Sequence, residues 1–161
     1  MQMKPLRTSL IAAAFALLPF AAWSQLPPPT LAARSSLLLD MSSGQTLAAS
    51  DADTKIEPAS LTKLMTAYLV FAALRDKKLT LDQRPPVSAP AYKAIGSRMF
   101  VEPARPATVD ELLHGMIVQS GNDASIVLAE AVAGTEAGFA ELMNREAARI
   151  GMKNTRFRNA T

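Results

Sequence analysis

The sequence predicts an α+β fold in which helices pack on an antiparallel sheet. A short apolar run, a group of turn residues and a second extended segment favour a β-hairpin near the start of the folded part. Most of the remaining chain carries apolar residues at helical spacing, interrupted by connections rich in proline and glycine. With 161 residues, 49% of them apolar, the chain can form one packed core.

Residues 1–24 have the three-part layout of a secretory signal peptide. Lys4 and Arg7 supply positive charge, residues 10–22 are nearly all apolar, and Ala22 and Ser24 are small residues that suit cleavage after Ser24. The apolar run of about 13 residues is shorter than the roughly 20 that a membrane-spanning helix needs. We therefore expect cleavage rather than an uncleaved anchor, and export to the bacterial periplasm.

Residues 25–34 are expected to form a proline-rich linker, because three consecutive prolines favour the polyproline II conformation. The folded domain is then expected over residues 35–161. Within it, residues 35–40 are predicted to form a buried strand, and residues 46–50 to pair back with it across a turn that contains Gly44.

Four helical segments are expected beyond the hairpin. The first, from Ser60 to about Arg75, is apolar on nearly all sides, which is typical of a buried helix. Thr108 and Glu111 form a capping-box pattern that opens the second. The third runs over residues 124–133, and the fourth over residues 135–150 with a C-terminal glycine. Prolines exclude long elements from residues 76–105, although residues 99–101 are expected to form a short strand.

Composition excludes several classes of function. The chain has no cysteine, so it has no disulfides and no thiolate zinc site. His114 is the only histidine, which argues against a catalytic metal site and against a Ser-His-Asp triad. The net charge is +3, and no run of lysine or arginine suggests a nucleic-acid surface. We expect no metal, no cofactor and no nucleic-acid partner.

The tetrapeptide from Ser60 to Lys63 places a hydroxyl and an amine one helical turn apart at an expected helix start. A lysine that loses its proton can act as the base for a serine nucleophile. A simpler interpretation makes Ser60 a helix cap and Lys63 a surface residue. However, a lysine in a mostly apolar helix is a misplaced charge unless it has a partner or a chemical role.

A second motif, Ser120-Gly121-Asn122, follows sixty residues later. Its residue types, with Asp123 after them, also suit an ordinary turn between two helices. Together with the first motif, in this order and in an exported chain, it matches two of the three motifs of active-site-serine enzymes that act on D-alanyl peptides and β-lactams.

In extended context, PASLTKLMT at residues 58–66 and SGNDA at residues 120–124 resemble the D-alanyl-D-alanine carboxypeptidases among the low-molecular-mass penicillin-binding proteins. The resemblance extends through residues 36–161 and includes segments 39–48, 97–101, 113–119, 139–142 and 151–157. It implies the β-lactamase/transpeptidase-like fold, with a peptidoglycan stem pentapeptide as substrate and β-lactam antibiotics as covalent inhibitors.

The resemblance also implies the role of each site residue. Ser60 would attack the carbonyl between the two terminal D-alanines, and Lys63 would accept its proton. Ser120 would relay a proton to the departing D-alanine. Asn122 would bind the peptide and position Lys63. The backbone N–H of Ser60 would form half of an oxyanion hole.

The family's third motif, Lys-Thr-Gly, does not occur in the sequence. We therefore interpret the chain as an N-terminal fragment that lacks the C-terminal sheet strands and the C-terminal region through which the family can associate with membranes. Two strands cannot cover the apolar helix that begins at Ser60, and they leave an open sheet edge. Residues 25–161 alone are therefore expected to be aggregation-prone and catalytically inactive.

Four other interpretations remain open at this point. A D,D-endopeptidase or a β-lactamase would share the fold and both motifs. A catalytically inactive fragment, which at most binds penicillin weakly, is the non-enzymatic alternative. An exported helical binding module would not depend on Ser60 at all.

Overall fold

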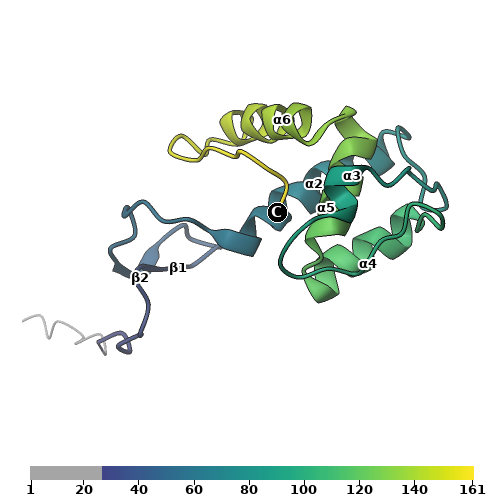
Figure 1. The fold of residues 1–161 in the computed structure, drawn as a ribbon. Coiled ribbons are helices and arrows are strands. Elements are labelled where there is room, and N and C mark those ends of the chain that lie inside the picture. Colours follow the sequence, from purple (N-terminus) through teal and green to yellow (C-terminus); the bar gives the residue numbers. More distant parts are fainter. Residues whose placement is uncertain (1–26) are drawn as a thin grey trace, which may run out of the picture. The chain divides into compact units, whose positions relative to one another are not determined.

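A computed structural model describes residues 27–161 (Figure 1). The described chain forms two units, one ending at Lys55 and the other covering Ile56–Thr161, and each is treated by itself. The predicted signal peptide lies outside the described residues and stays a prediction. Residues 27–35 contain neither helix nor strand. Across residues 27–161, no helix combines the length and the apolar character needed to cross a membrane.

The first unit contains the predicted hairpin. Strands β1 (Ser36–Leu39) and β2 (Thr46–Ser50) pair antiparallel, with a register irregularity between Leu38 and Leu39. The strand pairing confirms the hairpin prediction. The burial prediction was wrong, because the β1 leucines are exposed.

The hairpin turn is organised by Asp40. Its carboxylate accepts hydrogen bonds from the backbone N–H of Ser42 and from the hydroxyls of Ser42 and Ser43, at 2.6–2.9 Å. These bonds favour the charged form and lower the pKa of Asp40 to about 2. Gly44 takes the positive φ of 72° that the turn requires.

The second unit consists of helices. A 3₁₀ turn, η2 (Ala59–Leu61), leads into α2 (Thr62–Arg75). These are followed by α3 (Ala89–Tyr92), α4 (Val109–Gln119), α5 (Asn122–Ala133) and α6 (Glu136–Arg149). The four predicted helices are confirmed, with α5 beginning two residues earlier than expected. The short α3 was not predicted.

Local sequence explains where α4 and α6 begin. The Thr108 hydroxyl accepts from the backbone N–H of Glu111, and the Glu111 carboxylate accepts from the backbone N–H of Thr108. This reciprocal pair confirms the predicted capping box. At the start of α6, the Thr135 hydroxyl accepts from the backbone N–H of Gly138. Two of the helices are therefore capped by the residue types that the sequence supplies at those positions.

Helix α5 is the centre of this unit. It packs against α2, α3, α4 and α6, and Figure 1 shows it between α4 and α6. Residues 123–129 of α5 are buried without interruption. The packing of α5 against α2 matters because the second motif ends at Asn122, the first residue of α5.

Two details of this unit differ from the expectations. Residues 99–101 do not form a strand, because the backbone N–H groups of Met99 and Val101 donate to the carboxylate of Asp123 instead of to a neighbouring strand. Helix α2 is buried on one side only. An exposed apolar stripe runs along the other side, at helical spacing, through Leu61, Leu64, Tyr68 and Phe71.

Candidate active site

Ser60 lies in the 3₁₀ turn that precedes α2, and Lys63 lies in the first turn of α2. Ser60 is exposed, whereas Lys63 is only 7% exposed. The Ser60 hydroxyl does not cap the helix: Leu61 is the N-cap residue, and no side chain caps it. Instead, the Ser60 Oγ lies 3.4 Å from the Lys63 Nζ. The cap interpretation is therefore excluded for this serine.

Burial controls the chemistry of Lys63. Removal from water disfavours the ammonium form, so the pKa of Lys63 is lowered from its ordinary value of 10.5. A lysine of lowered pKa is deprotonated more readily and can then accept a proton from a neighbouring hydroxyl. The separation of 3.4 Å from Ser60 is long for a proton transfer, but such contacts often shorten only when substrate binds.

The partner of Lys63 comes from the second motif. The Lys63 Nζ donates a hydrogen bond of 2.7 Å to the Oδ1 of Asn122. Asn122 is the first residue of α5, so the helix that forms the core also carries this side chain to Lys63. Sequence reasoning expected Asn122 to position Lys63, and the two side chains do meet.

The turn between α4 and α5 sets the direction of Asn122. Ser120 takes a left-handed conformation, with φ 56° and ψ 35°, and ends α4. The backbone N–H of Gly121 donates to the carbonyl of Gly115 at 3.0 Å. The segment is thus the interhelical turn that its composition favours. It also carries a site residue, so the two interpretations of this motif do not exclude each other.

Asn122 is held from its other side by residues 95–97, to which the sequence analysis gave no role at the site. Its Nδ2 donates to the carbonyl of Ile95 at 2.7 Å, and its backbone N–H donates to the carbonyl of Ser97 at 2.8 Å. Between them lies Gly96, with φ +84°, where a Cβ would approach the Nδ2 of Asn122 to 2.9 Å. In the sequence, the isolated Gly96 before residues 97–101 was the one signal of a close backbone approach at this point.

Ser120 is not joined to the other three residues. Within residues 27–161, no hydrogen bond links its hydroxyl to Ser60 or to Lys63, and the side chain is half-buried. The structure therefore brings together Ser60, Lys63 and Asn122. The relay role of Ser120 remains a prediction.

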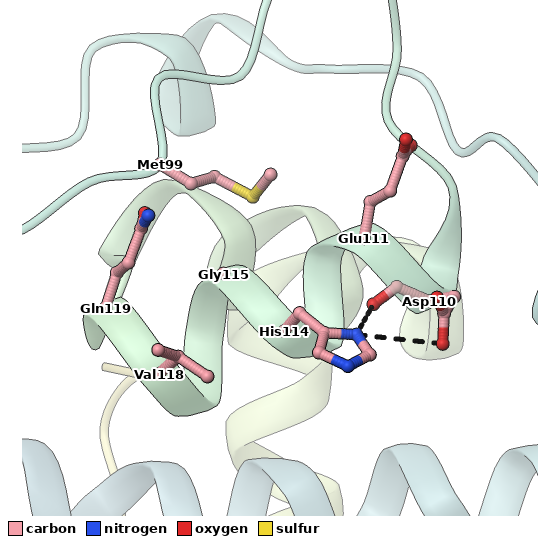
Figure 2. Close-up of a pocket in the computed structure, with 7 residues that line it drawn as sticks. All are labelled: Met99, Asp110, Glu111, His114, Gly115, Val118 and Gln119. Atoms are coloured by element: carbon pink, nitrogen blue, oxygen red, sulfur yellow. Dashed lines mark hydrogen bonds and ion pairs between the residues drawn. The ribbon is translucent and has the colours of Figure 1, made fainter.

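His114 lies on the outer face of α4, beside a shallow hollow of about 500 Å³ (Figure 2). Its side chain is 73% exposed, and its Nδ1 lies 2.9 Å from the backbone carbonyl of Asp110. The hollow is lined by residues of α4 and by Met99, and by none of the site residues described above. Its position gives no support to a Ser-His-Asp arrangement with Ser60.

The match to a family model decides the family. The model is that of the D-alanyl-D-alanine carboxypeptidases, and it covers residues 22–161. The chain belongs to this D-alanyl-D-alanine carboxypeptidase family.

Among its relatives, D-alanyl-D-alanine carboxypeptidase DacC of Escherichia coli K12 is 43% identical over 150 residues, which are 89% of this chain and 37% of that protein. The crystal structure of penicillin-binding protein 5 from Haemophilus influenzae matches with a TM-score of 0.79 and 36% identity, over 84% of this chain and 40% of that one. Ampicillin-bound penicillin-binding protein D2 from Listeria monocytogenes matches with a TM-score of 0.73 and 29% identity, over 83% and 54%.

These likenesses confirm the predicted transpeptidase/β-lactamase-like fold for this family member. The chain is much shorter than these relatives: the match spans little more than a third of the carboxypeptidase from Escherichia coli. The described site is correspondingly the Ser-Lys and Ser-x-Asn part of what the family resemblance implies.

Proposed function

We propose that this chain contributes the nucleophile half of a serine-type D-alanyl-D-alanine carboxypeptidase. The enzyme would remove the terminal D-alanine from peptidoglycan stem pentapeptides through an acyl-enzyme on Ser60. The observation that carries the proposal is the buried Lys63 amine, which lies 3.4 Å from the Ser60 hydroxyl and 2.7 Å from the side-chain Oδ1 of Asn122. Lys63 by itself can remove the proton from the Ser60 hydroxyl and so generate the nucleophile.

The reaction begins with proton transfer from the Ser60 hydroxyl to neutral Lys63. Ser60 attacks the carbonyl between the two D-alanines, and its own backbone N–H, at the start of a helix, helps to stabilise the oxyanion. The bond to the terminal D-alanine breaks, and the proton that Lys63 accepted passes through the Ser120 hydroxyl to the leaving amine. Water then hydrolyses the ester on Ser60 and releases the shortened peptide.

Asn122 has two tasks in this scheme. Its Oδ1 orients the Lys63 amine, and its amide group is available to the peptide backbone of the substrate. A β-lactam places its reactive carbonyl at the same position, so it should acylate Ser60 and leave slowly. A crystal structure of a relative with bound ampicillin supports this part of the proposal.

The cation that holds the substrate carboxylate, and the second oxyanion donor, would come from a Lys-Thr-Gly strand. That motif does not occur within these 161 residues, while the relatives are considerably longer. We therefore assign the activity to the whole protein, exported to the periplasm. Residues 27–161 by themselves are assigned only the nucleophile Ser60, its base Lys63, the proton relay Ser120 and Asn122.

The test is mass spectrometry of the product of the whole gene after treatment with benzylpenicillin. We expect one covalent adduct, located on the peptide that contains Ser60 and absent from Ser60→Ala. Ser50→Ala, which changes an exposed serine at the end of β2, is the matched control and should be acylated normally. An adduct that persists in Ser60→Ala would overturn the proposal.

Substrate assays separate the related activities. A carboxypeptidase releases D-alanine from a stem pentapeptide, an endopeptidase instead cleaves a cross-linked peptide dimer, and a β-lactamase turns over penicillin without accumulating the adduct. Release of D-alanine as the dominant reaction is the expected result.

A further inference from the structure

Asp123 is a buried carboxylate to which the proposed mechanism gives no task. It is 1% exposed, and no lysine, arginine or histidine of the described chain forms a salt bridge with it. A charge without a counter-ion is costly to bury unless hydrogen bonds replace its contacts with water. Three backbone N–H groups donate hydrogen bonds to the Asp123 carboxylate, and the positions of these donors in the chain indicate its role.

One of the three donors is local and two are remote. The Oδ1 accepts from the backbone N–H of Ala124 at 2.9 Å, inside the first turn of α5, where a negative charge is favourable. The Oδ1 also accepts from the N–H of Met99 at 3.0 Å, and the Oδ2 from the N–H of Val101 at 3.0 Å. The place of Asp123 in the first turn of α5 accounts for the first bond but not for the other two.

The two remote bonds fix an unusual backbone. Met99 and Val101 flank Phe100, which has φ 64°, a conformation that residues with a side chain seldom adopt. Because of this conformation, alternate N–H groups of the segment reach one carboxylate. Without Asp123, both N–H groups would lose their acceptor, and the Met99–Val101 backbone would have no reason to remain in this shape.

The same segment holds Asn122. The carbonyls of Ile95 and Ser97 accept the hydrogen bonds of the Asn122 side chain and backbone, at 2.7 and 2.8 Å. The Oδ1 of Asn122 in turn accepts from Lys63 at 2.7 Å. Two sets of hydrogen bonds, joined by the backbone of residues 95–101, therefore connect the Asp123 carboxylate to Asn122 and, through Asn122, to the Lys63 amine.

We propose that Asp123 is a positioning residue, whose carboxylate holds residues 95–101 in the conformation that presents the Asn122 side chain to Lys63. The kinetic consequence rests on the proposed function, whereas the geometric one does not. Asp123 itself touches neither the nucleophile nor the base.

The central variant is Asp123→Asn, tested in the product of the whole gene. The asparagine amide keeps one acceptor oxygen. Its NH₂ group replaces the other oxygen and cannot accept a hydrogen bond, so at least one backbone N–H group loses its acceptor. Misplacement of Asn122 by a fraction of an ångström should slow acylation of Ser60 by benzylpenicillin about 10- to 100-fold. The loss should fall on the acylation rate constant more than on the preceding binding constant. Asp123→Ser, which is smaller and keeps a single acceptor, is a second variant with the same expectation.

A double-mutant cycle distinguishes positioning from general destabilisation. If Asp123 acts through Asn122, then Asp123→Asn should change acylation less than about twofold in an Asn122→Ala background. The matched control is Asn144→Ala. Asn144 also clamps a distant backbone, accepting from the N–H of Phe157 at 2.7 Å and donating to its carbonyl at 2.8 Å. This variant should lose stability while its folded fraction is acylated at the normal rate.

A second readout does not depend on catalysis. Proton exchange of the Asn122 side-chain amide, followed by NMR, should be slow in the wild type and in Asn144→Ala, and at least tenfold faster in Asp123→Asn or Asp123→Ser. Absence of any adduct in the wild type would overturn the proposed function, and this exchange measurement would still decide the role of Asp123. Unchanged exchange in both Asp123 variants, or equal slowing of acylation with and without Asn122, would overturn the inference.

Discussion

The Nζ of Lys63 and the Oδ1 of Asn122 lie 2.7 Å apart, although 59 residues separate them in the chain. This contact joins the start of α2 to the start of α5. It gives a buried amine a polar partner without giving it a counter-ion, so the amine is held in place but its charge is not strongly favoured. A lysine in this setting is suited to accept a proton from Ser60.

The first prediction concerns the proton acceptor. Lys63→Arg keeps a long cationic side chain, but a guanidinium does not lose its proton at accessible pH. Acylation of Ser60 by benzylpenicillin should therefore fall about 10²- to 10⁴-fold, the usual contribution of a general base. The rate of adduct formation in the product of the whole gene, followed by mass spectrometry, measures this. Lys78→Arg, at an exposed lysine, should be acylated normally. Acylation of Lys63→Arg at the wild-type rate would exclude Lys63 as the base.

The second prediction concerns pH. Burial lowers the pKa of Lys63 from 10.5, and only the neutral amine accepts a proton. Acylation should thus rise with pH while Lys63 deprotonates, and level off once the pH exceeds its pKa, at a value below 10.5. A pH profile of the acylation rate measures the midpoint, and Lys63→Arg should lack this rise. A midpoint at or above 10.5 would show that burial does not control this amine.

The third prediction concerns Gly96. In Gly96→Ala the new Cβ would lie 2.9 Å from the Nδ2 of Asn122, and the positive φ of 84° would also be strained. A residue with a side chain in the left-handed conformation is strained by roughly 1–2 kcal/mol. Gly134→Ala is the matched control, because Gly134 has φ +79° but open space around it. Thermal unfolding should show similar destabilisation of both variants, while the acylation rate should drop, by about tenfold or more, only in Gly96→Ala. Equal acylation rates in the two variants would mean that Asn122 tolerates displacement.

The fourth prediction concerns the exposed stripe on α2. Leu64 is 71% and Phe71 50% exposed, within a run of large apolar side chains on one helix face. Apolar patches of this kind promote association. Residues 27–161 prepared alone should self-associate and release no D-alanine from a stem pentapeptide. Leu64→Lys should weaken the association about tenfold in analytical ultracentrifugation.

Two further variants serve as controls for the self-association of residues 27–161. Ile150→Lys changes a single exposed apolar residue at the end of α6 and should leave the association unchanged. Leu112→Lys buries a charge in the core and should instead unfold the unit. Monomeric behaviour of residues 27–161 at high concentration would contradict the prediction.

Local sequence determined much of this protein. Apolar spacing located the helices, and the Thr108–Glu111 pair marked the start of α4 because its capping bonds lie within one turn. Ser60 and Lys63 could be paired in advance, since residues three apart share a helix face. Family resemblance added Ser120 and Asn122, which spacing alone could not separate from an ordinary turn. The burial of α2 was overestimated, because its composition does not reveal which face lacks a neighbour.

Only the tertiary structure decided how these parts meet. Residues 99–101 read as a strand from their composition, yet their N–H groups bind the carboxylate of Asp123, a partner more than twenty residues away. The roles of Ile95 and Gly96 depend equally on where α5 places Asn122. The sequence by itself therefore determined the pairing of Ser60 with Lys63 and the helices that carry these residues, because those relations are local. The support of Asn122, and the exposure of one face of α2, were decided by long-range packing.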